Sequence, residues 1–258
     1  MANDKSISSN YLFHFTKNIK NLSNIMNNYF MPFYCLEKLS FLPEIDKITN
    51  DYFEMAFPLV CFCDIPEQSQ NKHRSKFGEY GIALHKQWGM KNLLTPILYT
   101  YEDAIPVKNL KYLIEFFRKE KDKFEESTHQ EYNNHISYLL MHYKSYEGYF
   151  YLKGKKKFSK KKRIFYDERE WRHIPSYCDN IDLCLSRKDF QNNRILKEKN
   201  KLIQLNNKLA FSVDDIKYIY LNENNEISPF LQSISGKYTK SELIKIQKRI
   251  KINKKTCP

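Results

Sequence analysis

Short apolar runs separated by polar segments organise the first hundred positions of the chain. The run YLFHFT at 11–16 predicts a short strand, and apolar residues at helical spacing over 17–28 predict a helix directly after it. FPLVCFCDIP at 57–66 is typical of a buried strand that ends in a turn. Further strands are expected to begin within 80–89 and 95–103.

The second half of the chain alternates helical and extended patterns. Apolar positions predict an amphipathic helix over 107–126 and a second helix over 136–146 that packs beside it. The run KYIYLNEN at 217–224 predicts another strand. We expect a final helix in the basic tail, with Ser241 as its N-cap.

This order of elements has no internal repeat and no Pro/Gly/Ser-rich linker, so it predicts an α+β fold. We expect a single domain over residues 1–258, with a mixed or antiparallel sheet flanked by helices. Within it, residues 1–10 are expected to form a flexible N-terminus, 153–163 a basic loop and 251–258 a frayed C-terminal end.

The composition indicates a globular protein, because hydrophobic residues make up 41% of the 258 positions and aromatic residues 15%. The chain opens on the polar segment MANDKSISSN, and no apolar stretch of about 18 residues follows it. We therefore expect neither a signal peptide nor a membrane span. Six cysteines without a regular spacing predict reduced thiols, and with them a cytoplasmic protein.

The formal net charge of +13 favours a polyanionic partner such as nucleic acid. Eight lysines and arginines lie within the eleven residues KGKKKFSKKKR at 153–163. One interpretation is a solvated loop in a Lys-rich chain, and the other is a loop that contacts phosphates. In the second interpretation the contacting residues are Lys155, Lys156, Lys157, Lys160, Lys161, Lys162 and Arg163.

The stretch FYDEREWRHIP at 165–175 follows the basic segment and is charged on both faces if it is extended. Glu168, Glu170 and Arg172 then share one face, and Trp171 anchors the other against the body of the protein. Two carboxylates this close raise each other's pKa or need a cation between them, so we expect them to line a site. The alternative is an exposed edge strand whose charges discourage aggregation.

Such a carboxylate pair can serve two kinds of chemistry. It can hold a sugar hydroxyl and stabilise a developing oxocarbenium ion, as in glycosyl transfer. It can also bind Mg²⁺, but a metal nuclease built on the pair and Asp64 ranks lowest, because the sequence around them lacks a nuclease-like context. Cys61 and Cys63 do not have the usual spacing of a zinc knuckle, and we expect no metal site.

Polar residues at strand ends supply further candidates. His14 and Thr16 lie at the end of the first strand, just before a helix, where a phosphate or a ribose could bind. A buried histidine with a satisfied hydrogen bond is the structural alternative for His14. His73 and Tyr80 could line the edge of a cleft with Asp64, unless Asp64 only caps its turn.

The order of several motifs resembles the AbiGi family, small bacterial proteins of abortive-infection phage resistance that are described as antitoxins. The resemblance spans roughly residues 11–231 and rests on HFT, FCDIP, H-x6-Y-G-x-x-L-x-x-x-W-G, P-x-L-Y and Y-x-E-R-E-W-R. The matching residues are His14–Thr16, Phe62–Pro66, His73, Tyr80, Gly81, Leu84, Trp88, Gly89, Pro96, Leu98, Tyr99, Tyr166 and Glu168–Arg172. The resemblance implies a role in phage defence without specifying a chemistry.

A looser resemblance does specify a chemistry. The H-F-T motif and the helix after it are similar to the start of DarT-type ADP-ribosyltransferases, which modify DNA. The E-x-E pattern resembles the acidic motif of arginine-directed ADP-ribosyltransferases, although the chain has no S-T-S motif. This resemblance implies a split sheet with an NAD-binding cleft. Glu170 would be the catalytic carboxylate that holds the ribose 2′-hydroxyl of NAD, and Glu168 its partner on the acceptor side.

The same resemblance assigns the remaining candidates. His14 and Thr16 would hold a ribose of NAD, Tyr80 would stack on the nicotinamide, and Arg172 would belong to the same cofactor site. His73 and the basic segment would contact the nucleic-acid substrate.

Two functions therefore stay open at the level of sequence. One is an enzyme that transfers ADP-ribose from NAD to a nucleic acid or a nucleic-acid-associated target in phage defence. The other is a non-catalytic antitoxin or regulator whose basic surface binds nucleic acid or a cognate toxin. Binding of NAD would distinguish them, because only the first requires it.

Overall fold

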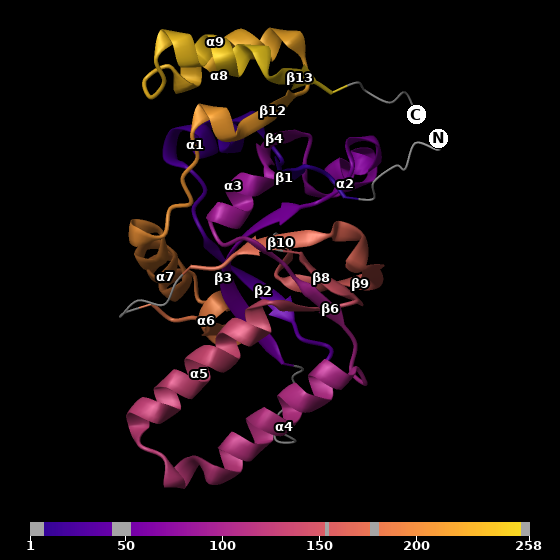
Figure 1. Ribbon diagram of the computed structural model, residues 1–258, viewed down its shortest axis with the longest axis vertical. Helices are drawn as coiled ribbons and strands as arrows, with labels where there is room; N and C mark the ends of the chain where they lie inside the picture. The colour runs from indigo at the N-terminus through magenta and orange to yellow at the C-terminus, as the bar shows by residue number, and fades with distance from the viewer. Residues whose placement is uncertain (1–7, 43–52, 153–154, 176–180, 254–258) are drawn as a thin grey trace.

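A mixed nine-stranded sheet with helices packed against it forms the body of the protein, as a computed structural model shows (Figure 1). The structure describes residues 8–42, 53–152, 155–175 and 181–253. The strand order is β13-β12-β4-β1-β3-β10-β5, with β2 and β11 also paired to β3. Only the β12–β13 pair of this sheet is parallel among the described strands. The predicted α+β fold with a mixed sheet is confirmed.

The strands and helices alternate along the chain. The strands of the large sheet are β1 (Tyr11–Thr16), β2 (Phe33–Lys38), β3 (Glu54–Cys63), β4 (Tyr80–His85), β5 (Thr95–Pro96), β10 (Glu170–His173), β11 (Leu185–Ser186), β12 (Ile216–Leu221) and β13 (Ile250–Ile252). Two further pairs are β6 (Leu98–Thr100) with β7 (Tyr143–Ser145), and β8 (Glu147–Leu152) with β9 (Lys157–Ile164). The helices are α1 (Ile19–Asn28), α2 (Gln70–Phe77), α3 (Lys86–Lys91), α4 (Ile105–Glu120), α5 (Glu126–Met141), α6 (Arg187–Gln191), α7 (Asn193–Asn206), α8 (Ile227–Ile234) and α9 (Lys240–Lys248).

The long strand β3 joins two parts of the sheet. Its apolar sequence EMAFPLVCFC is buried along most of its length, as expected for a strand covered on both faces. Its first half pairs with β2 and β11, and its second half pairs with β1 and β10. Side chains of β1, β2 and β3 therefore converge where the pairing changes from one half to the other.

Helices cover the sheet at one end and extend from it at the other (Figure 1). α1, α8 and α9 contribute Leu22, Phe230 and Ile246 to the largest apolar core, which includes Trp171 of β10. α4 and α5 project from the opposite end as a helical hairpin. No helix in the described part of the chain is long and apolar enough to cross a membrane.

Several predicted elements have different limits in the structure. The segment 95–103 contains two short strands rather than one, and the helix predicted over 136–146 instead spans 126–141 and is followed by β7. The predicted N-cap Ser241 is wrong, because Thr239 accepts from the backbone N–H of Glu242 and caps α9.

The ends of the chain are described only in part. Most of the predicted flexible segment 1–10 lies outside the described residues, as do the last five positions of 251–258. Residues 251 and 252, where fraying was expected to begin, belong to β13, which pairs with β12.

Candidate functional site

A cavity of about 360 Å³ lies where β1, β2 and β3 converge, and the hairpin β8–β9 and helix α2 complete its walls. Its lining is largely aromatic and includes Phe13, Phe15, Phe33, Phe77, Tyr149, Phe150, Phe158 and Phe165. The polar side chains that line it are fewer and include His14, Glu37, Lys38, His73, Lys144, Ser145, Glu168 and Glu170. Mostly apolar walls with a few polar groups are typical of a small-molecule site.

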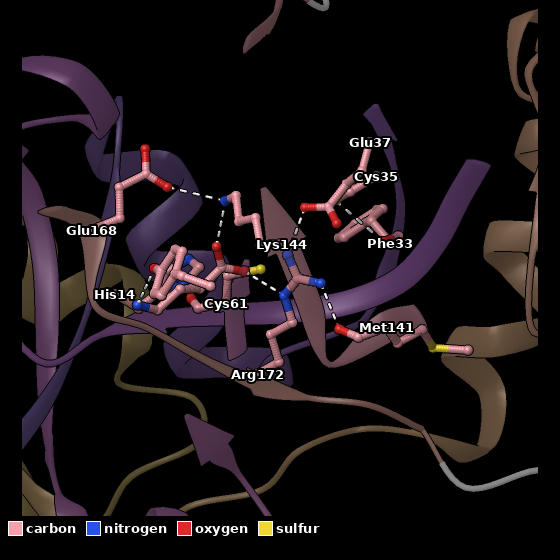
Figure 2. Close-up of polar contacts among 11 residues, drawn as sticks. His14, Phe33, Cys35, Glu37, Cys61, Met141, Lys144, Glu168 and Arg172 are labelled. Carbon is pink, nitrogen blue, oxygen red and sulfur yellow. Dashed lines mark hydrogen bonds and ion pairs between the residues drawn. The ribbon is translucent and has the colours of Figure 1, made fainter. Parts of the chain in front are cut away.

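Lys144 holds the two carboxylates of the E-x-E motif together. Its Nζ lies 2.5 Å from Oε2 of Glu170 and 3.0 Å from Oε2 of Glu168 (Figure 2). Glu168 and Glu170 are 5% and 6% exposed, so both pairs are shielded from solvent. Of the two alternatives that the sequence left open, raised pKa values or a cation between the carboxylates, the structure has the cation, and it is Lys144.

Arg172 also anchors Glu170, through a direct hydrogen bond. Its side chain is fully buried; Nε donates to Oε1 of Glu170 at 2.6 Å and a terminal nitrogen donates to Oε1 of Glu37, also at 2.6 Å (Figure 2). The other terminal nitrogen donates to the carbonyl of Met141 at the end of α5. Arg172 does not line the cavity and acts on it through Glu170 and Glu37.

Burial and the ion pairs act in opposite directions on the pKa values of Glu170 and Lys144. Burial favours the neutral form of Glu170, but Arg172 and Lys144 hold its pKa far below its usual value. Burial also disfavours the ammonium of Lys144, but Glu170 and Glu168 raise its pKa well above the usual value. With Glu37 included, three carboxylates face two cations, so this network by itself has a formal charge of −1. Lys38 also lines the cavity and adds one further cation outside the network.

The backbone brings the two glutamates together in a way that differs from the predicted continuous strand over 165–175. Tyr166–Glu168 form a 3₁₀ turn, Arg169 adopts a left-handed conformation with φ 45°, and β10 begins only at Glu170. The hydroxyl of Tyr99 accepts from the N–H of Glu170 at 2.9 Å and fixes the start of the strand. Trp171 lies in the main core on the other face, as predicted.

His14 lines the cavity with Glu170. Its Nδ1 lies 2.9 Å from the carbonyl oxygen of Cys61, and burial lowers the pKa of its imidazole. The structural alternative, a buried histidine with a backbone hydrogen bond, therefore also describes it. Thr16 is buried at the strand end, accepts from the side chain of Asn21 at 3.0 Å and does not line the cavity.

The structure does not bring Tyr80 to the cavity. Its hydroxyl donates to Oε1 of Glu226 at 2.6 Å, beside the start of α8. His73, by contrast, lines the cavity from α2, and burial together with nearby Lys76 lowers its pKa to about 4.

Gly78 ends α2 with φ +135°, and a Cβ there would lie 2.1 Å from the carbonyl oxygen of Thr16. Only glycine allows this close approach of α2 to β1.

The predicted basic loop is largely a β-hairpin strand. Residues 157–164 form β9, which pairs with β8, and Phe158 contributes to the cavity wall. The basic residues that are exposed on this segment are Lys155, Lys156, Lys157, Lys160, Lys161 and Lys162. Arg163 is half-buried over the ring of Phe150, 4.7 Å from its centroid. The positive charge therefore lies on the outside of an element whose inner face closes the cavity.

Asp64 serves the fold in this structure. It accepts from the N–H of Ser9 at 2.7 Å and pairs with Lys86 at 2.7 Å, which fixes the segment before β1. Cys61 and Cys63 are free thiols whose pKa burial raises. Among the described residues, no three or more His, Cys, Asp or Glu side chains are grouped to hold a metal ion.

Sequence reasoning missed Lys144 and Glu37. Lys144 follows α5 within a segment that was predicted to be helical, and Glu37 ends an unpredicted strand, β2. Neither position carries a motif, since an isolated Lys or Glu is most often a solvated surface residue.

Comparison with known proteins gives a family. A sequence profile described as "Putative abortive phage resistance protein AbiGi, antitoxin" matches residues 28–222. The abortive phage resistance protein AbiGi of Lactococcus lactis subsp. cremoris is 28% identical over 243 residues, which cover 87% of this chain and 95% of that protein. No solved structure matches the chain, so the ADP-ribosyltransferase-like division of the sheet stays a prediction.

Proposed function

The chain belongs to the AbiGi family of abortive phage-resistance proteins, and we propose that in this role it binds NAD in the aromatic cavity and transfers ADP-ribose to a nucleic acid or a nucleic-acid-associated target. The observation that carries the proposal is the convergence of Glu168 and Glu170 with His14 around this cavity.

Buried hydrogen-bond acceptors support a ligand with hydroxyl or amide donors. Three residues that line the cavity each have a buried oxygen without a hydrogen-bond partner in the described part of the chain. These oxygens are Oε1 of Glu168, Oε2 of Glu37 and Oγ of Ser145. Most buried polar atoms in proteins are paired, and an ionised carboxylate can only accept. The hydroxyls of a ribose and the carboxamide of nicotinamide are donors of the required kind, and the surrounding rings suit a planar base.

The charge of the site fits the chemistry of glycosyl transfer. In such a step the bond between ribose C1′ and the nicotinamide nitrogen breaks, and its electron pair leaves with nicotinamide. An oxygen or nitrogen of the acceptor then bonds to C1′ and releases its proton to solvent. Positive charge develops on the ribose in between, and the net negative charge of the Lys144 network would stabilise it.

The geometry divides the roles of the two glutamates. The two oxygens of Glu170 accept from Arg172 and from Lys144, and the carboxylate would use a remaining lone pair for the ribose 2′-hydroxyl. Glu168 has a whole oxygen, Oε1, left for the acceptor side. Phe77 and Phe150 lie at the cavity and would take the stacking role first assigned to Tyr80.

Isothermal titration calorimetry with NAD tests this function. We expect the wild-type chain to bind NAD and to release nicotinamide in the presence of single-stranded oligonucleotides, and Glu170→Gln to lose nearly all release. Glu198→Gln, an exposed glutamate on α7, is the matched control and should behave as the wild type. Full nicotinamide release by Glu170→Gln, or no heat of NAD binding to the wild type, would contradict the assignment.

A second function is favoured by a different observation. The exposed lysines of β9 and of the preceding turn form a basic surface that would bind a polyanion without any catalytic step. The family description includes the word antitoxin. A regulator that binds nucleic acid or a toxin through this surface would leave the carboxylate network as part of the fold. It predicts oligonucleotide or toxin binding that NAD does not affect.

A further inference from the structure

A second cavity, of about 310 Å³, adjoins the first and shares His73 and Glu168 with it. The two differ in character, because the first is walled by aromatic rings and the second presents the cationic side chains of Lys76 and Arg169. The remaining lining of the second cavity is Ile65, Pro66, Ser69, Tyr166 and Asp167. A ligand that occupied both cavities would lie next to the two shared residues, His73 and Glu168.

The shared wall carries an acceptor that is ready for a ligand. Glu168 is 5% exposed, its Oε2 is bonded to Lys144, and its Oε1 has no hydrogen-bond partner within the part of the chain that the structure describes. A hydroxyl between the two cavities would satisfy this oxygen. Leaving such an atom buried and unpaired has a free-energy cost, which a bound donor would remove.

The charges of the second cavity suit an anion. Lys144 compensates the charge of Glu168. The other charged residues that line the second cavity are two cations, Lys76 and Arg169, and one carboxylate, Asp167. The backbone of Arg169 is fixed, because its carbonyl accepts from the N–H of Asp64 at 2.9 Å. A guanidinium and an ammonium in one concave site are the groups that proteins use to bind phosphates.

An aromatic face stands at the same cavity. The side chain of Tyr166 is 50% exposed and its ring stacks on that of Tyr146, with centroids 5.7 Å apart and planes inclined by 27°. An exposed, supported ring of this kind offers a surface for a nucleobase.

We propose that the second cavity binds the phosphates of the nucleotide whose ring and ribose occupy the first, so that one nucleoside diphosphate ligand spans both cavities. The identity of the group in the first cavity rests on the proposed function. A ribose hydroxyl donates to one lone pair of Oε1 of Glu168 and leaves the other for the acceptor, the phosphates contact Lys76 and Arg169, and the second base lies against Tyr166.

Calorimetry with the two parts of NAD tests this proposal. Nicotinamide riboside carries no phosphate and probes the first cavity, whereas ADP-ribose carries both phosphates and probes the second. The variants are Lys76→Ala and Arg169→Gly; glycine keeps the left-handed backbone at 169 and removes only the side chain. Lys119→Ala, an exposed lysine on α4 that lines neither cavity, is the matched control.

We expect each variant to weaken ADP-ribose binding by about tenfold and to leave nicotinamide riboside binding and thermal unfolding unchanged. Unchanged ADP-ribose affinity in both variants would overturn the proposal. Binding of neither compound to the wild type would overturn it together with the proposed function. If ADP-ribose binds through Lys76 and Arg169 but NAD is not turned over, the phosphate site stands and the transferase function fails.

Discussion

Two charged regions that adjoin in sequence have opposite environments in the fold. The strand β9 (Lys157–Ile164) carries its lysines into solvent, whereas Glu168, Glu170 and Arg172 are buried beside Lys144. An exposed ion pair such as Lys162–Glu147, at 2.9 Å, gains little because water screens it. Breaking a buried pair at a similar distance lowers the free energy of unfolding much more, because the remaining charge has no water to solvate it. Charged residues that adjoin in sequence therefore contribute very differently to stability, according to whether the fold leaves them in solvent or buries them with partners.

The largest expected effect comes from breaking the buried network at Lys144. Lys144→Met keeps the length of the side chain but leaves Glu168 and Glu170 facing each other, so we expect the free energy of unfolding at pH 7 to fall by about 3 kcal/mol. Urea unfolding followed by circular dichroism measures it. Lys144→Arg should recover a large part of the loss. A Met variant as stable as the wild type would show that the carboxylates are not held by this lysine.

His73 extends the comparison between exposed and buried charges, because it is largely buried and stays uncharged at neutral pH. Its pKa is lowered to about 4 in the folded protein by burial and Lys76, below the usual value of 6.5. As pH falls from 6.5 to 4, the unfolded chain takes up a proton that the folded chain does not, so stability is lost over this window. We expect His73→Gln to lose less stability than the wild type between pH 7 and pH 5.

The matched control for His73 is the exposed His135→Gln on α5, which should follow the wild type. His14 and His173 also have a pKa lowered by burial, so part of the pH dependence remains in every variant. Identical pH dependence in His73→Gln and the wild type would contradict the expected neutral histidine.

The smallest effect on stability is expected from the exposed hairpin. Replacing Lys160, Lys161 and Lys162 by Ala should change the free energy of unfolding by less than about 1 kcal/mol. Binding of a single-stranded oligonucleotide should weaken, and the slope of log K against log salt should decrease by about 2 to 3. Fluorescence anisotropy over a salt series measures both.

Exposed lysines elsewhere separate a local contact from overall charge. Replacing Lys188, Lys197 and Lys201 on α6 and α7 by Ala removes the same charge and should leave the salt slope close to that of the wild type. An equal decrease in both triple variants would assign oligonucleotide binding to net charge rather than to β9.

Local patterns were sufficient for much of the secondary structure. The alternation and apolar runs of 11–16, 57–66 and 217–224 predicted β1, β3 and β12 within a few residues, and helical spacing predicted α1 and α4. Segments with mixed signals were misread. The basic segment has too few apolar residues to be recognised as a strand, and β9 forms because Phe158 packs inward while the lysines remain solvated.

Part of the candidate site was also present in the sequence. Charge spacing alone placed Glu168, Glu170 and Arg172 together, and it predicted either raised pKa values for the carboxylates or a cation between them. It did not identify that cation as Lys144, nor did it show that the phenol of Tyr80 is bonded to Glu226 rather than directed to the cavity. The backbone of Arg169 is left-handed and separates Glu168 from the strand β10. Nothing in the sequence around the E-x-E motif indicates this conformation.

The sequence by itself determined the α+β elements, the basic surface, the family and the close spacing of the acidic pair. The tertiary structure alone decided which distant groups meet them: Glu37 and Arg172 are 135 positions apart in the chain, and Lys144 and Glu170 are 26 apart. Periodicity and propensity act over a few residues, so they fix local structure. Contacts across such separations depend on how β2, β7 and β10 pack, and only there does a buried charge acquire its partner.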